Sequence, residues 1–368
     1  MPESGAFHCE GVPPAFLPAS VTVLTSLLQR GGRSSYRRAA GSSTLSKQSI
    51  DTALAALEAL RSSPTSPETV AHLRKALKHR NNYVASKAAV LIAELGARTL
   101  VPDLIDAFDH FLQNPIKSDS QCWAKSAIAK ALMDLGHDDA GIYLRGMAHV
   151  QLEPVWGGRE DTAATLRGTC ALALVHCRLD PVSIEKRLVD LLSDTEKAVR
   201  IDALRAISQF PDAPLLLRVK AIAGDPFPEV TGQCFASLLD ISSDDVDFVA
   251  RFLDIQHGDL CFEAVAALGA CRKPPGIAAL IACWREQLNP ELRAAILTSL
   301  GASRDATAYE FLLSLMANAS FETASAAMTS LARSRFIPGI RRRAAAVVES
   351  RGHTRLTAAF EQAFAEPS

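Results

Sequence analysis

The stretch LSDTEKAVRIDALRAIS, Leu192 to Ser208, contains the pattern that decides the fold. Asp194 stands where a turn is expected, and Val199 opens a run in which apolar residues recur every three or four positions. This spacing is typical of an amphipathic helix, which needs a neighbour to cover its apolar face. The stretch therefore predicts a turn followed by a helix that packs against other helices.

The same unit recurs along the chain at a nearly fixed interval. Successive steps of 31 residues from Val199 open similar apolar stretches at Val230, Cys261, Leu292, Thr323 and Thr354. Towards the N-terminus the equivalent positions are Leu166, Ala124 and Val84, at spacings of 33, 42 and 40 residues. A second amphipathic stretch lies between each pair of neighbouring positions. Such periodic helix pairs predict an α-solenoid, in which stacked hairpins share one continuous core.

The composition agrees with close-packed helices. Hydrophobic residues make up 48% of the 368 residues but aromatic residues only 6%, so the apolar content is mainly Ala and Leu, which favour helices. Lys and Arg (39) balance Asp and Glu (40), and no global field therefore attracts the chain to nucleic acid or membrane. The eight cysteines contain no C-x-x-C motif, and we expect reduced, packed thiols in a cytoplasmic protein. We expect no signal peptide and no membrane span.

The chain divides into two regions by composition. Residues 1–47 are rich in Gly, Ser and Arg, and we expect a mostly disordered tail with one candidate short helix at Val21–Leu28. Residues 48–365 carry the repeated pattern. We expect them to form one continuous solenoid.

The repeated unit resembles the HEAT repeat, in which a turn Asp precedes a helix that begins with Val-Arg. Three units keep an acidic residue five positions before the repeat position and a basic residue just after it: Asp119 with Lys125, Asp161 with Arg167, and Asp194 with Arg200. The resemblance implies an all-α, right-handed α-solenoid of about nine to ten HEAT-like hairpins. It also implies that these six side chains form a ladder of hydrogen bonds along the stack.

Two insertions interrupt the repeats and provide the candidate site. One spans residues 151–160 and carries Trp156, Arg159 and Glu160, while the other, Asn114 to Ser118, precedes Asp119 and carries Lys117. Together they are expected to place these four residues near one another and near Trp123. Equivalent turns of neighbouring repeats lie along one edge of a solenoid, so we expect the two insertions to be adjacent. Trp and Arg are frequent anchors of protein interfaces, and inserted loops often mark a binding face. The alternative is that Trp156 folds back and covers the base of its own loop, or caps an apolar gap.

The leading hypothesis for function is a non-catalytic scaffold or adaptor that binds a protein partner. HEAT-like arrays serve several functions, so the fold does not select one. One alternative is an enzyme related to HEAT-like lyases or DNA glycosylases, although no His-Glu, H-E-x-x-H, P-loop or G-x-G-x-x-G motif occurs. Another is nucleic-acid binding through the basic C-terminal repeats around Arg341–Arg343. We expect no metal and no cofactor.

Overall fold

The computed structural model of the chain describes residues 40–62 and 66–365, and within them the protein is all-helical apart from one short pair of strands, β1 (Leu152–Val155) and β2 (Gly158–Asp161). The predicted tail, with its candidate helix Val21–Leu28, lies outside these residues except for its last part, where α1 begins at Ala40. The α-helices are α1 (Ala40–Leu60), α2 (Pro67–Leu77), α3 (Asn82–Glu94), α4 (Val101–Gln113), α5 (Pro115–Ser118), α6 (Trp123–Asp134), α7 (Ala140–Met147), α8 (Ala164–Leu174), α9 (Pro181–Asp190), α10 (Lys197–Ile207), α11 (Ala213–Ala223), α12 (Pro228–Ile241), α13 (Val246–Ala250), α14 (Leu260–Ala270), α15 (Pro274–Glu286), α16 (Pro290–Ala302), α17 (Ala306–Asn318), α18 (Phe321–Ala332), α19 (Ile340–Arg351) and α20 (Thr354–Ala363).

Local sequence signals set where many of these helices begin. Ser66 accepts a hydrogen bond from the Thr69 amide at the start of α2, and Asn289 accepts one from the Leu292 amide at the start of α16. In both cases proline occupies the first helical position, where the backbone N–H would have no partner within the helix. The predicted helical stretches of the repeats are all helices in the structure.

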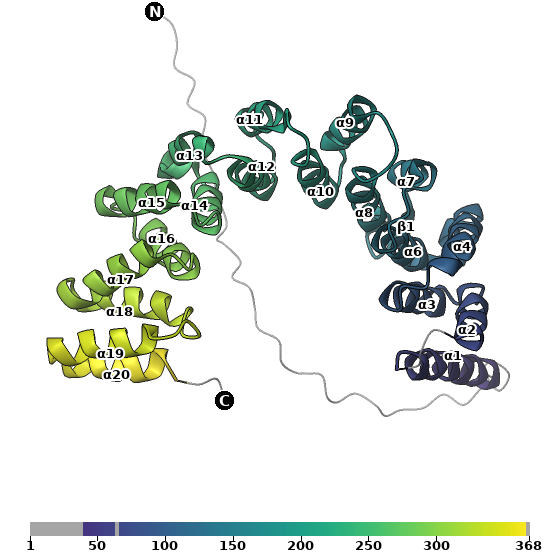
Figure 1. Cartoon of the computed structure of the whole chain (residues 1–368), viewed down its shortest axis with the longest axis horizontal. Helices are drawn as coiled ribbons and strands as arrows, with labels where there is room; N and C mark the ends of the chain where they lie inside the picture. The colour runs from purple at the N-terminus through teal and green to yellow at the C-terminus, as the bar shows by residue number, and fades with distance from the viewer. Residues whose placement is uncertain (1–39, 63–65, 366–368) are drawn as a thin grey trace, which may run out of the picture. The chain divides into compact units, whose positions relative to one another are not determined.

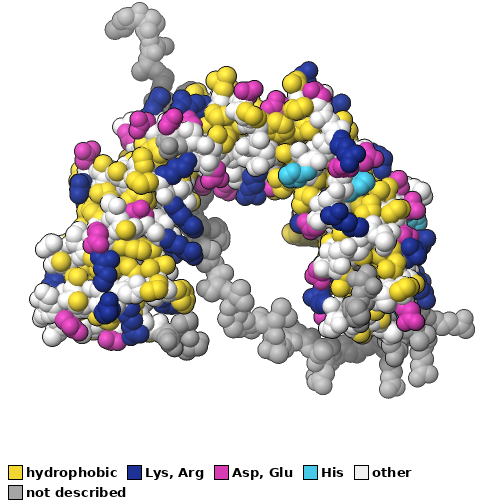
Figure 2. Space-filling view, in the orientation of Figure 1, with side chains coloured by type: hydrophobic (Ala, Val, Ile, Leu, Met, Phe, Trp, Pro, Cys, Tyr) yellow, Lys and Arg dark blue, Asp and Glu magenta, His cyan; other side chains and the backbone are white. Residues whose placement is uncertain are grey.

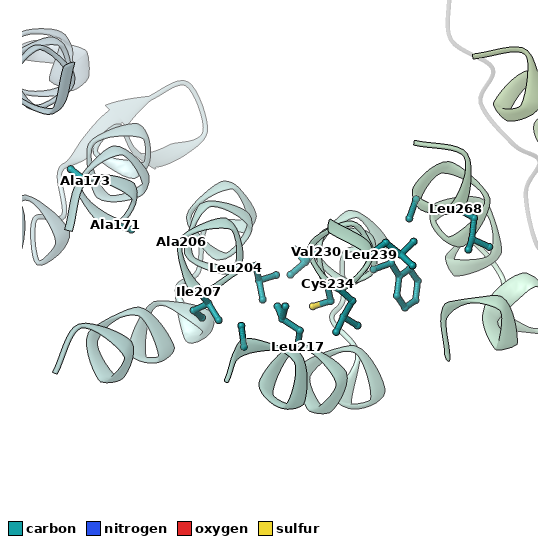
Figure 3. Close-up of a cluster of buried hydrophobic side chains, with 14 of the residues drawn as sticks. Ala171, Ala173, Leu204, Ala206, Ile207, Leu217, Val230, Cys234, Leu239 and Leu268 are labelled. Atoms are coloured by element: carbon teal, nitrogen blue, oxygen red, sulfur yellow. The ribbon is translucent and has the colours of Figure 1, made fainter. Parts of the chain in front are cut away.

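Neighbouring helices pack against one another in chain order (Figure 1). The second helix of each predicted hairpin contacts the second helix of the next, in the series α3, α6, α8, α10, α12, α14, α16, α18 and α20. Each of these helices also contacts the first helix of its own hairpin. Figure 3 shows how the core forms at one such junction, where Leu204, Leu217 and Cys234 point toward one another from α10, α11 and α12.

The predicted repeat positions are buried over most of the chain. The seven fully buried positions are Val84, Ala124, Leu166, Val199, Val230, Cys261 and Leu292. Thr323 is half-buried and Thr354 is exposed, so the pattern weakens towards the C-terminus. The cysteines within the described residues are free thiols, and five of them are buried. In the same part of the chain, no helix combines the length and the apolar character needed to cross a membrane.

Candidate interaction site

The insertion at residues 151–160 folds into a β-hairpin, which the sequence analysis did not predict. Strands β1 (Leu152–Val155) and β2 (Gly158–Asp161) pair antiparallel, with Val155 opposite Gly158. Trp156 and Gly157 form the two-residue connection, and Gly157 has a φ of +90°, a value that favours glycine. The hairpin lies between α7 and α8, so it is an addition to one repeat and leaves the helical packing on either side intact.

Trp156 at the tip of the hairpin is fully exposed, with 104% of its reference surface accessible. The alternative in which Trp156 packs against its own loop is therefore wrong. Leu152 and Val155 in β1 are also exposed, as is Arg159 in β2. The hairpin thus presents an indole and two aliphatic side chains to solvent.

The base of the hairpin, in contrast, is held by buried hydrogen bonds. Glu153 is only 6% exposed, and its Oε1 accepts from the Gln121 amide at 2.7 Å. The same oxygen accepts from Gln151 Nε2 at 2.6 Å and from Thr162 Oγ1 at 2.8 Å. Gln151 Nε2 also donates to the carbonyl of Asp119 at 2.8 Å. These bonds join the base of the hairpin to Asp119 and Gln121, directly after the second insertion.

The chain entering α6 adopts an uncommon backbone conformation at this junction. Gln121 and Cys122 have φ values of 61° and 54°, in the left-handed region that non-glycine residues seldom occupy. Each such residue costs about 1 kcal/mol or more. Asp119 compensates, because its carboxylate accepts from the Ala124 and Lys125 amides at 2.8 and 3.0 Å. The backbone conformation brings the Gln121 amide to Glu153.

Acidic and basic side chains connect successive repeats at the same edge. The fully buried pair Lys125 and Asp119 lies at 2.9 Å. Arg167 bonds to Asp161 at 2.6 Å and, through two nitrogens, to Asp194 at 2.8 and 2.9 Å. Arg167 therefore binds the acidic residue of the next repeat as well as that of its own repeat.

Arg200 likewise binds the acidic residue of the next repeat, Asp225, but not the side chain of its own Asp194. It bonds to Asp225 at 3.0 and 2.7 Å, but it reaches Asp194 only at the backbone carbonyl, at 2.7 Å. The direct side-chain pair of Asp194 with Arg200 is thus replaced by a pair between Arg200 and Asp225 of the next repeat.

Burial alone would raise the pKa of Asp161 and Asp225. For Asp161, hydrogen bonds from the Gln151 and Ala163 amides and from Arg167 outweigh burial and lower its pKa. For Asp225, Arg200 makes the largest opposing contribution and the net pKa is again lowered.

A pocket of about 540 Å³ lies beside the hairpin. Its walls come from α3, α6 and α8, from β2, and from the residue preceding α10. The lining residues that matter for the argument are Tyr83, Gln121, Trp123, Glu160, Asp161 and Glu196. Trp123 is half-exposed and meets Tyr83 edge to face, with ring centroids 5.5 Å apart.

The structure divides the five residues predicted for partner binding into two groups. Trp123 and Glu160 line the same pocket. Trp156, Arg159 and Lys117 are exposed but do not line it; Lys117 lies in the short helix α5. The prediction missed Tyr83, Gln151, Glu153 and Glu196. The two-residue Trp-Gly connection between short polar segments is the signal that indicates a hairpin and, with it, an inward-facing Glu153.

Several C-terminal arginines are engaged within the protein. Arg351 donates to the carbonyls of Met316 and Ala319 at 2.6 and 2.5 Å, where it satisfies the end of α17. Arg343 pairs with Glu310, and Arg355 lies over the Phe321 ring at 4.2 Å. Arg341 and Arg342 are exposed. Figure 2 shows side chains of both charge signs spread over the visible face rather than one continuous basic surface.

Comparisons with known proteins do not extend this picture. No family model matches the sequence, and no curated protein matches it. Among the residues that the structure describes, no group of three or more His, Cys, Asp or Glu side chains is placed to hold a metal ion. Functional inference therefore depends on the geometry of the hairpin and the pocket.

Proposed function

We propose that this chain is a non-catalytic scaffold or adaptor, acting in the cytoplasm, that binds a protein partner through the β1–β2 hairpin. Residues 48–365 would form a right-handed solenoid of about nine to ten HEAT-like hairpins, with the insertions along one edge. The serial contacts of the second helices and the buried repeat positions support this architecture. The arginines that bridge neighbouring repeats are consistent with it.

The observation that carries the proposal is the contrast between the tip and the base of the hairpin. Trp156 is wholly exposed, whereas Glu153, three residues earlier, is buried with three hydrogen-bond donors. A rigid support reduces the conformational entropy lost when the indole enters a partner's pocket. Tryptophan is also among the residues that contribute most to binding energy at protein interfaces.

The pocket gives less support to an enzyme. Asp161 is the most constrained carboxylate in its wall, and its pKa is lowered because bonds from the Gln151 and Ala163 amides and from Arg167 outweigh the effect of burial. A general acid needs a pKa shifted in the opposite direction. Both oxygens of Asp161 are already engaged in structural bonds. Three of the C-terminal arginines, Arg343, Arg351 and Arg355, contact protein groups, and this reduces the number of free cations there for nucleic acid.

Affinity capture from the native host with the Trp156→Ala variant tests the proposal. Deletion of residues 151–160 is a poor test, because it would also remove Gln151 and Glu153 from the buried base. Trp156→Ala alters only the exposed tip, so the melting temperature should stay within about 1 °C. Leu288→Ala is the matched control, because Leu288 is also highly exposed but lies between α15 and α16.

The expected result is a protein that wild type and Leu288→Ala retain and that Trp156→Ala loses. Purified partner should then bind the variant at least about tenfold more weakly, as is usual for a central interface tryptophan. Equal capture by all three proteins would contradict the proposal.

A further inference from the structure

The pocket beside the hairpin combines aromatic rings with carboxylates that have no partner. Tyr83 and Trp123 form one wall, while Glu160 and Glu196 contribute acidic groups. Within the described part of the chain, neither glutamate side chain has a hydrogen-bond or ion-pair partner. Aromatic faces attract cations, and carboxylates do so more strongly. The wall chemistry is therefore suited to a positively charged group.

The cross-strand register increases the negative charge at this wall. Glu160 lies directly opposite Glu153 in the hairpin, and residues directly opposite share one face of a β-ladder. Like charges in this position destabilise a hairpin. Glu153 is stabilised by its own three hydrogen bonds, but none of these groups neutralises Glu160. A cation in the pocket would relieve this repulsion.

The cations already present near the pocket leave this charge largely uncompensated. Arg167 is bonded to Asp161 and Asp194, and Lys197 is paired with Glu229 at 2.7 Å. Lys125 is buried against Asp119. Lys87 is the exception, since its Nζ lies 5.2 Å from the centre of the Tyr83 ring. Lys87 does not line the pocket, and no bond joins it to Glu160 or Glu196.

We propose that the pocket receives an arginine side chain of the protein partner, with the guanidinium against Trp123 and in contact with Glu160 and Glu196. Arginine fits better than lysine, because its planar group stacks on an indole and offers several N–H donors to two carboxylates at once. This inference rests on the proposed partner binding and specifies its chemistry. Trp156 and Glu160 are four residues apart across the hairpin turn, so one partner surface of ordinary size covers both.

An NMR titration with Nα-acetyl-arginine amide tests the inference on the full chain. The protein has three tryptophans, and the Trp123 indole N–H is assigned by its loss in Trp123→Phe. Nα-acetyl-citrulline amide is the matched control ligand, because it replaces the guanidinium with a neutral urea of similar shape. We expect a saturable shift of the Trp123 indole with arginine, at a dissociation constant on the order of 1–10 mM, and no saturable shift with citrulline.

Charge variants identify the groups responsible. The double variant Glu160→Gln, Glu196→Gln should weaken arginine binding about fivefold or more, as expected when two carboxylates that contact the cation are lost. The control Glu349→Gln, Glu361→Gln changes the net charge equally at exposed positions near the C-terminus and should leave binding unchanged. Equal shifts with arginine and citrulline would overturn the inference, and so would equal affinities of the two double variants.

The outcomes separate this inference from the proposed function. Trp156→Ala should abolish partner capture but leave arginine binding to the pocket unchanged. If Trp156→Ala loses the partner while wild type shows no arginine-specific shift, the pocket inference fails and the scaffold proposal stands. If arginine binds as expected but Trp156→Ala captures every protein that wild type does, the hairpin proposal fails.

Discussion

Replacement of Arg167 by methionine should be among the most destabilising single changes at the repeat edge. The Arg167 side chain is 3% exposed and makes four hydrogen bonds, one to Asp161, two to Asp194 and one to the carbonyl of His149. Methionine keeps most of the aliphatic packing but removes every donor. Two carboxylates and a carbonyl would then be left in a poorly hydrated environment.

The expected loss follows from which groups remain unpaired. Removing one partner of a buried ion pair usually costs about 3–5 kcal/mol. Asp161 keeps its bonds from the Gln151 and Ala163 amides, and Asp194 keeps one from the Glu196 amide. These remaining donors place the expected loss at the lower end, about 3 kcal/mol in the free energy of unfolding.

Urea denaturation followed by circular dichroism at 222 nm measures this loss. Arg205→Met is the matched control, because Arg205 also pairs with an aspartate, Asp202, but is about half exposed. Exposed pairs contribute about 1 kcal/mol or less. Equal destabilisation by the two substitutions would refute the reasoning, because it would mean that burial of Arg167 adds nothing to its contacts.

Three further predictions concern packing, the hairpin base and pH. Gly301→Ala should lower the free energy of unfolding by about 2 kcal/mol, because the added Cβ would lie 2.2 Å from the Ser330 backbone oxygen. Gly168→Ala is the control and should cost less, because the nearest atom there belongs to the Asp202 side chain, which can move. Glu153→Gln should lower stability by about 1–3 kcal/mol and speed hydrogen exchange at the Gln121 amide, because the charged acceptor of three donors is lost; unchanged exchange would contradict it. The pKa values of Asp161 and Asp225 are lowered in the folded protein, so both ionised carboxylates stabilise the fold at pH values above the ordinary aspartate pKa. This contribution is lost as the pH falls through the folded-state pKa values, and the urea midpoint should therefore fall with acidification below about pH 4. The decrease should be smaller in Asp225→Asn than in wild type.

The helical core was predictable from the sequence because its signals are local. Apolar spacing and proline at helix starts depend on neighbours within a few residues, which is why the positions from Val84 to Leu292 are buried as predicted. The pattern weakens at Thr323 and Thr354, where hydroxyl side chains replace the apolar ones.

The candidate site was predictable only in part because its geometry depends on distant contacts. Glu153 became a buried acceptor through Gln121, 32 residues away, and no short-range pattern indicates such a bond. The forward reach of Arg200 to Asp225 depends on the spacing between adjacent repeats, whereas the sequence analysis paired it with its own Asp194. The exposure of Trp156 followed from the two-residue turn, which the sequence contains but the helical pattern obscured.

Site-specific photo-crosslinking in the native host tests the central claim most directly. The photoreactive residue p-benzoylphenylalanine replaces Trp156 in one variant and Leu288 in another, so that both probes stand at exposed apolar positions. The account predicts a discrete crosslinked species with a second protein from position 156 and none of that mass from position 288. A position 156 probe that yields no adduct beyond the position 288 background would contradict it.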